Sequence, residues 1–245
     1  MIGLLLKKFF YDGWDNFFLI IAVNLGFILF LALAFILITI SEITGILLFF
    51  LVIYWLFVYL CSAAAVLKEI SDYRHPALAD FFKNIKGAFF PAAVLFAASA
   101  FVLLVIRFTI PIYLHMETIA GLGAAIFSCW ICLFIIASIQ FYPAVYYRLG
   151  MHPLKSLKKC AAIFFDNTLF SFFTLFINII LTLLILPFPG CPLLFLDEAL
   201  RLRLFKYDWL ETHARKIKIP WNELLAEEKE NTGSRSLKSL IFPWK

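Results

Sequence analysis

The chain has 245 residues, of which 64% are hydrophobic and 15% charged, and its formal net charge is +5. A soluble domain is about 45–50% apolar and about 25% charged, so this composition excludes a single water-bounded core and favours a membrane protein. The positive charge does not require a nucleic-acid partner, because Lys and Arg in cytoplasmic loops of a membrane protein already account for it.

The first predicted element is an interfacial amphipathic helix at residues 1–16. Its alternative is an ordinary lead-in to the first membrane span. An interfacial helix buries its apolar side at the acyl boundary and turns its cations to the headgroups. The expected apolar side chains are Leu4, Leu5, Phe9, Phe10 and Trp14, and the expected headgroup contacts are Lys7 and Lys8.

Five apolar runs follow, each long enough for a helix to cross a hydrocarbon core, which takes about 20 residues. Three Pro residues (187, 189 and 192) interrupt the last run, so its straight helix is predicted to end near Leu186. The five predicted spans cover residues 17–40, 43–67, 87–106, 119–147 and 167–196.

A sixth segment, at residues 188–205, has two interpretations. It is either a Pro-broken return to the cytoplasm, which the basic residues after it favour, or an interfacial helix. Its charged residues cannot face lipid, so we expect it to pack against protein or near the inner interface. The predicted fold is all-α: a polytopic transmembrane helix bundle at residues 17–210, followed by a polar, basic tail at residues 211–245. The charged residues of the sixth segment are Asp197, Glu198, Arg201 and Arg203.

Two connecting loops, at residues 68–86 and 148–166, each hold four Lys or Arg. The positive-inside rule therefore predicts that both loops and the N-terminus lie on the cytoplasmic side. The expected location is the bacterial cytoplasmic (inner) membrane, with several passes.

Both loops contain a His-Pro pair, at residues 75–76 and 152–153, followed by apolar residues at helical spacing. Pro suits the first position of a helix, so each pair is predicted to start an amphipathic helix that leads into the next span. The likeness indicates either a weak parallel repeat or chance. The basic C-terminus is either a docking segment or a disordered end. The candidate contacts with a partner or with membrane lipid are Lys83, Lys86, Lys155, Lys158, Lys159, Arg235, Lys238 and Trp244.

Polar residues in the fifth span recur three and four positions apart and so share one helical face. Either they form a path or site for a small solute, or they make interhelical hydrogen bonds, worth about 0.6 kcal/mol each. The candidate residues are Ser171, Thr174, Asn178 and Thr182, with Asn24 of the first span and Gln140 of the fourth as possible neighbours.

The pattern Cys129-Trp-Ile-Cys132 has the spacing of a redox pair, but it lies in an apolar helix, where thiol pKa values rise. The four His residues are scattered, and no nucleotide-binding or nucleophile motif occurs. With no nucleophile, general base or metal set to name, we expect neither an enzyme nor a bound cofactor or metal.

Three stretches resemble a known family. They are Ala-Ala-Ala-Val-Leu-Lys at residues 63–68, Asp-Phe-Phe-Lys-Asn-Ile-Lys-Gly-Ala-Phe-Phe at residues 80–90, and Phe-Tyr-Pro-Ala-Val-Tyr-Tyr-Arg at residues 141–148. They are similar to the YesL-like family of bacterial integral membrane proteins (domain of unknown function 624), over residues 14–210. The resemblance implies an accessory or scaffold role beside a carbohydrate uptake system such as a sugar ABC transporter, and it supplies no catalytic residues. A small-solute transporter or a lipid-handling protein is the alternative.

Overall fold

The computed structural model describes residues 2–40, 45–184, 189–213 and 219–233. All regular structure in these ranges is helical, which confirms the all-α prediction. Four helical segments are long and apolar enough to cross a membrane, and a bent pair of helices makes a fifth if it is counted as one span. The four segments are Phe17–Ile36, Leu48–Ser71, Leu78–His115 and Ile119–Leu149.

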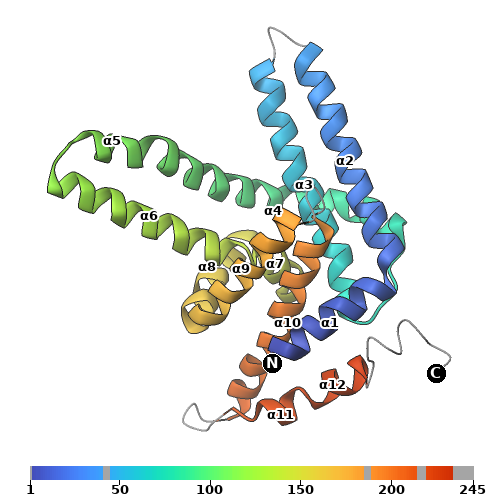
Figure 1. The fold of residues 1–245 in the computed structure, drawn as a ribbon. Coiled ribbons are helices and arrows are strands. Elements are labelled where there is room, and N and C mark those ends of the chain that lie inside the picture. Colours follow the sequence, from blue (N-terminus) through green and yellow to red (C-terminus); the bar gives the residue numbers. More distant parts are fainter. Residues whose placement is uncertain (1, 41–44, 185–188, 214–218, 234–245) are drawn as a thin grey trace.

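The chain begins with α1 (Ile2–Asp15) and continues into a hairpin of α2 (Phe17–Ile40) and α3 (Gly45–Ser71). Figure 1 shows this hairpin rising from the rest of the molecule, with α1 across its base. Many side chains of α2 remain exposed, such as Phe18 at 86% and Leu29 at 62%. An apolar surface of this extent needs lipid or another protein as its environment.

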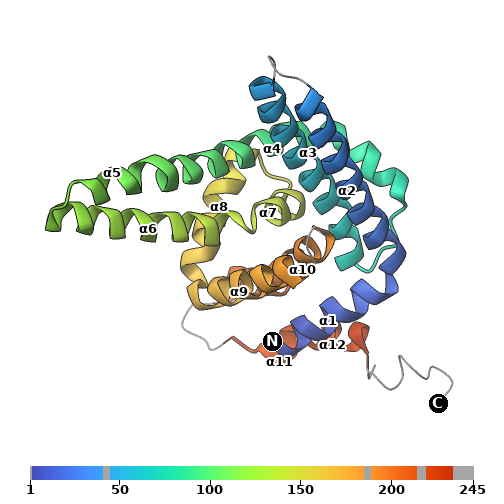
Figure 2. The same cartoon turned by 45° about the horizontal axis from the view of Figure 1, so that its top comes forward.

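A second hairpin is longer than its apolar runs predict. Its first arm is continuous from Leu78 to His115 through α4 (Leu78–Leu104), a π-helical turn (Val105–Thr109) and α5 (Ile110–His115). The predicted third span ends before Arg107, but an exposed cation interrupts no backbone hydrogen bond and the helix continues. At about 1.5 Å per residue the arm is about 57 Å long, well beyond a hydrocarbon core of about 30 Å. The return arm is α6 (Ile119–Ile139) and α7 (Tyr142–Leu149), and the two hairpins diverge (Figures 1 and 2).

Within the fifth predicted span, at residues 167–196, the structure describes one straight helix as far as Leu184, in keeping with the predicted end near Leu186. The structure has α8 (Pro153–Asp166) and α9 (Thr168–Leu184) at 107° to each other. The break lies at Asn167, whose side-chain amide donates to the carbonyl of Ile163 and to the hydroxyl of Tyr207. The prediction that each basic helix leads into the next span therefore holds for α4, which runs straight into its span, and is wrong for α8, which does not.

The sixth segment becomes α10 (Gly190–Thr212), which is not among the candidate spans. It passes through the middle of the described structure, orange in Figure 1. Every residue from Leu194 to Leu200 is buried. The expectation that its charged residues pack against protein is thus confirmed, and the cause is the shell of α1, α2, α3, α7 and α9 around it.

After Pro220 the chain forms two short helices, α11 (Trp221–Leu224) and α12 (Ala226–Thr232). Both lie beneath α1 and the lower end of α10 in Figures 1 and 2. The fully buried side chain of Leu225, between them, joins the main hydrophobic core. The part of the tail that the structure describes is therefore packed onto the bundle.

Candidate functional site

Charged side chains from five parts of the chain meet at the end of the molecule where α1 and α12 lie. We call this group the charge cluster. Burying a charge is costly unless it is paired and hydrogen-bonded, so each member needs a partner. The members are Lys8 and Asp12 of α1, Asp72 after α3, Arg148 of α7, Asp197, Glu198 and Arg201 of α10, and Glu228 of α12.

Arg148 bonds several residues at the centre of the charge cluster. Its guanidinium donates to both carboxylate oxygens of Asp197, one of them at 2.9 Å, to Asp72 at 2.9 Å and to the Ser71 hydroxyl at 2.8 Å. The Arg148 side chain is only 8% exposed, and that of Asp197 3%. A guanidinium suits this position because its planar fork binds carboxylates through two parallel hydrogen bonds. The pair joins α7 to α10 and to the loop after α3.

Arg201 and Tyr73 attach α12 to the same loop. Arg201 donates to Glu228 at 2.8 Å, to the Ser71 carbonyl at 2.9 Å and to Asp72. The second Glu228 oxygen accepts from the Tyr73 hydroxyl at 2.6 Å. Tyr73 has φ = 58°, a left-handed conformation that L residues rarely adopt, so these contacts hold a strained residue in place. Burial, and then the hydrogen bond to Glu228, raise the pKa of Tyr73, which therefore stays neutral.

Lys8 corrects the prediction that this residue faces lipid headgroups. It is fully buried. Its ammonium donates to Asp12 at 2.5 Å and to the Ser71 carbonyl at 3.1 Å, and it lies 3.7 Å from the centre of the Tyr73 ring. A carboxylate, a carbonyl and an aromatic face together replace its water. Leu5, predicted to face the acyl boundary, is also fully buried. The exposed large apolar side chains of α1 recur every four residues and are Ile2, Leu6, Phe10 and Trp14.

Glu198 is the most unusual member. It is fully buried, and neither carboxyl oxygen meets an N–H or hydroxyl donor within the described residues. Its polar neighbour is the Asp12 carboxylate, an arrangement that is a hydrogen bond only if one of the two groups carries a proton. Burial, reinforced by Asp12, raises the pKa of Glu198 well above its usual range, and burial also raises that of Asp12. Glu198 is therefore the protonated partner.

The polar face predicted on the fifth span is largely used within its own helix. Ser171 and Thr174 are fully buried, and their hydroxyls donate to the carbonyls of Asn167 and Ser171. Thr182 is exposed and bonds the carbonyl of Asn178. Gln140 does meet this face, since its amide donates to the Ser171 carbonyl at 3.0 Å.

Two side-chain oxygen atoms on or beside this face have no hydrogen bond in the described part of the chain. The Oε1 atom of Gln140 and the Oδ1 atom of Asn178 are buried and have no hydrogen-bond partner among the described residues. Asn24 lies elsewhere: its Oδ1 accepts from the Gly190 N–H at 2.9 Å and so ties α2 to the start of α10.

The two basic helix starts come together. α8 begins at Pro153, as predicted, whereas α4 begins at Leu78, two residues after Pro76, where the Asp80 carboxylate accepts from the Ala77 N–H at 2.9 Å. The rings of Phe90 and His152 lie 5.5 Å apart and join the helices.

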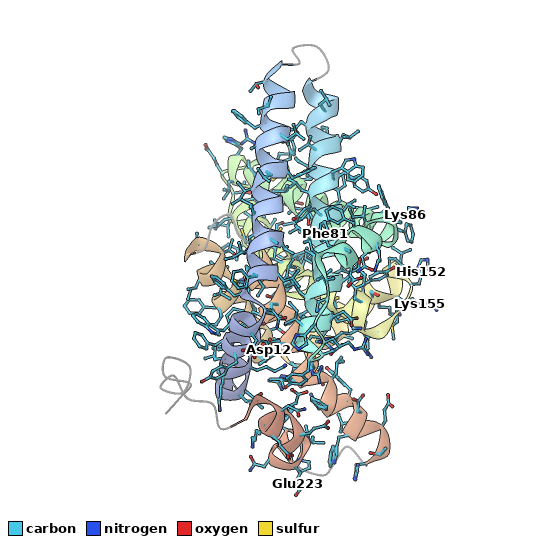
Figure 3. All side chains as sticks on the ribbon, turned by 90° about the vertical axis from the view of Figure 1, so that its right-hand side faces the viewer. Asp12, Phe81, Lys86, His152, Lys155 and Glu223 are labelled. Carbon is cyan, nitrogen blue, oxygen red and sulfur yellow. The ribbon has the colours of Figure 1, made fainter. Side chains whose placement is uncertain are left out.

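Three cations on these helix starts are exposed and have no ion-pair partner among the described residues: Lys86, Lys155 and Lys158, which we call the basic surface. Figure 3 shows Lys86, His152 and Lys155 on the same side of the molecule. The other candidate lysines are engaged, because Lys83 pairs with Asp80 at 2.7 Å and Lys159 lies 5.7 Å from the Tyr207 ring. Candidates Arg235, Lys238 and Trp244 lie outside the described residues.

The N-terminal helix and the residues that open the two basic loops meet at the charge cluster, where Lys8 of α1 and Arg148 of α7 both bond Ser71. Which side of the membrane the charge cluster faces stays a prediction. Of the charge cluster, the sequence pointed only to the residues of α10. A signal for Lys8 and Asp12 was their spacing of four on a helix that is otherwise apolar.

The candidate redox pair and the possible metal ligands form no shared site within the described residues. Cys129 is exposed and Cys132 buried, and both are free thiols. Within the described ranges no three His, Cys, Asp or Glu residues are placed to hold a metal ion. No family model, no curated protein and no solved structure matches the chain.

Proposed function

We propose that the protein is a non-enzymatic accessory or scaffold protein of the bacterial inner membrane that holds a membrane partner through its basic surface. The observation that carries this proposal is that Lys86, Lys155 and Lys158, on the neighbouring helices α4 and α8, are exposed and have no ion-pair partner among the described residues. The cations of the charge cluster, by contrast, are paired internally. The partner class follows from the family resemblance and is a carbohydrate uptake system.

The electrostatics suit a regulated contact rather than a permanent one. An exposed ion pair is worth about 0.2–1 kcal/mol, so three lysines orient a partner with an acidic surface more than they hold it tightly. Such contacts weaken as salt rises, because the Debye length falls from about 10 Å at 0.1 M to about 3 Å at 1 M.

The test is purification from native membranes in mild detergent, with a tag after Lys245 and quantitative mass spectrometry of the co-purified proteins. We expect a membrane component of a carbohydrate uptake system in a fixed ratio. The double change Lys155→Glu and Lys158→Glu should lower the recovery of this partner about tenfold. The new carboxylates would face the acidic surface of the partner, and like charges placed opposite each other weaken the free energy of binding by up to several kcal/mol.

The matched control is Arg107→Glu, which reverses an exposed cation at the far part of the second hairpin. This variant should retain the partner. Recovery that is unaffected by the α8 charge reversals, or the absence of any partner in fixed ratio, would overturn the proposal.

A second candidate is a small-solute transporter, favoured by the two unpartnered oxygens of Gln140 and Asn178. Buried acceptors of this kind commonly bind water or a polar ligand. Proteoliposomes should then swell in glycerol faster than protein-free vesicles, and the pair Thr174→Leu and Asn178→Leu should abolish the difference. Swelling equal to that of protein-free vesicles, or unchanged in a folded double variant, would discard this candidate.

A further inference from the structure

We propose that a groove between α2, α3 and α4 binds one anionic phospholipid, with an acyl chain in the groove and the phosphate beside Lys86. The groove has a volume of about 540 Å³. It opens on the flank of the first hairpin, toward the start of α4. Its wall residues include Ala22, Gly26, Trp55, Tyr59, Phe81 and Phe82.

The wall is built so that it offers almost only hydrocarbon. Among the described residues that line it, the hydroxyl of Tyr59 already donates to the Val23 carbonyl at 2.6 Å. A side chain at position 26 would meet that hydroxyl, since a Cβ there would lie 2.6 Å from it. Gly26 thus leaves room for the Tyr59 ring to lie against α2. The centre of this ring is 4.7 Å from the centre of the Phe81 ring of α4. An apolar ligand is favoured because such a wall cannot replace the hydrogen bonds of a polar one.

The size of the groove argues for a lipid chain rather than a partner helix. A transmembrane helix about 10 Å wide and about 30 Å long occupies about 2,400 Å³, so the groove holds little more than one of its turns. A volume of about 540 Å³ is instead ordinary for a small-molecule site, which spans about 300–1,000 Å³. Because α2 and α3 are candidate membrane spans, the abundant apolar molecule that reaches the groove is a lipid.

The charge at the edge of the groove selects an anionic headgroup. Phe82 and Ile85 line the groove, and Lys86 follows on the same helix, one turn after Phe82. Residues four apart share a helical face, so Lys86 lies beside Phe82, which lines the groove. It is exposed and has no carboxylate partner among the described residues, whereas Lys83 already pairs with Asp80. A lysine near a membrane surface attracts anionic lipid by about 1 kcal/mol.

The experiment uses the full chain in phosphatidylcholine vesicles that contain a small fraction of phosphatidylglycerol with a photoreactive acyl chain. After illumination, the labelled peptides are mapped by mass spectrometry. We expect labelling concentrated on groove residues such as Leu25 and Trp55. Ala22→Trp, which fills the groove, should abolish it, and Lys86→Gln should lower it about fivefold, corresponding to about 1 kcal/mol.

Two matched controls separate the site from general lipid contact. Ala32→Trp adds the same bulk to an exposed position of α2 outside the groove, and Lys158→Gln removes an exposed lysine of α8. Both should keep the groove labelled. Labelling spread evenly over all exposed apolar residues would overturn the proposal. So would loss of groove labelling in cross-linked dimers, because a second copy of the chain would then cover the groove. An equal signal from photoreactive phosphatidylcholine would refute the anionic preference. No transport partner is present, so this result is independent of the proposed function.

Discussion

Replacing Arg148 with Met should be among the most damaging single changes in the molecule. Arg148→Met keeps most of the side-chain volume but removes the donors to Asp197, Asp72 and the Ser71 hydroxyl. Asp72 retains Arg201 and Lys68 as partners, but the Arg148 guanidinium is the only cation paired with Asp197 in the described structure. Breaking a buried ion pair by removing one partner costs about 3–5 kcal/mol, because a charge stays buried without compensation.

The assay is unfolding in detergent micelles, followed by helix content as the fraction of a denaturing detergent rises. We expect Arg148→Met to lower the free energy of unfolding by about 3–5 kcal/mol. Asp197→Leu added to it should recover much of that loss, since the double variant leaves no orphaned charge at this position. Arg74→Met is the control: the Arg74–Glu69 pair is at 2.9 Å, but the Arg74 side chain is 69% exposed, so the cost should be about 0.2–1 kcal/mol. A cost for Arg148→Met no larger than that of the control, or strict additivity with Asp197→Leu, would refute the reasoning.

Two further predictions concern the charge cluster and a third concerns the start of α10. Because the folded pKa of Glu198 lies above its unfolded value, the folded state binds the extra proton and the protein should lose stability as pH rises from about 4.3 toward that folded pKa. Glu198→Gln should remove this decrease of stability with pH, and at pH 8 the variant should be more stable than the unchanged protein. An unchanged dependence of the unfolding free energy on pH in the variant would contradict this prediction. Glu228→Gln should loosen α12, seen as faster proteolysis after Pro220, and equal cleavage rates would argue against the role of its pairs with Arg201 and Tyr73. Gly190→Ala should cost about 1–3 kcal/mol, because its Cβ would lie 2.9 Å from the Asn24 amide oxygen, and no loss of stability would show that this contact relaxes freely.

The apolar runs by themselves predicted the all-α fold class and the four helical segments that are long and apolar enough to cross a membrane. The reason is physical: about 20 consecutive apolar residues have few environments open to them other than a bilayer. The same rule failed at boundaries, because composition does not record where a helix ends. The helix around Arg107 continues past that cation, and α8 does not lead straight into the fifth run, because the chain bends by 107° at Asn167.

Only the tertiary structure decided which charges are free. Lys8 and Lys86 are both lysines close to apolar runs, and one is fully buried while the other is exposed. The partners of Lys8 come from α1, from the end of α3 and, at 4.0 Å, from Glu228, which is 220 positions later in the chain. A local pattern carries no record of contacts at such separation. The charge cluster, the basic surface and the groove all arise from segments brought together by packing, which is why the sequence predicted the helices but only the fold revealed their shared sites.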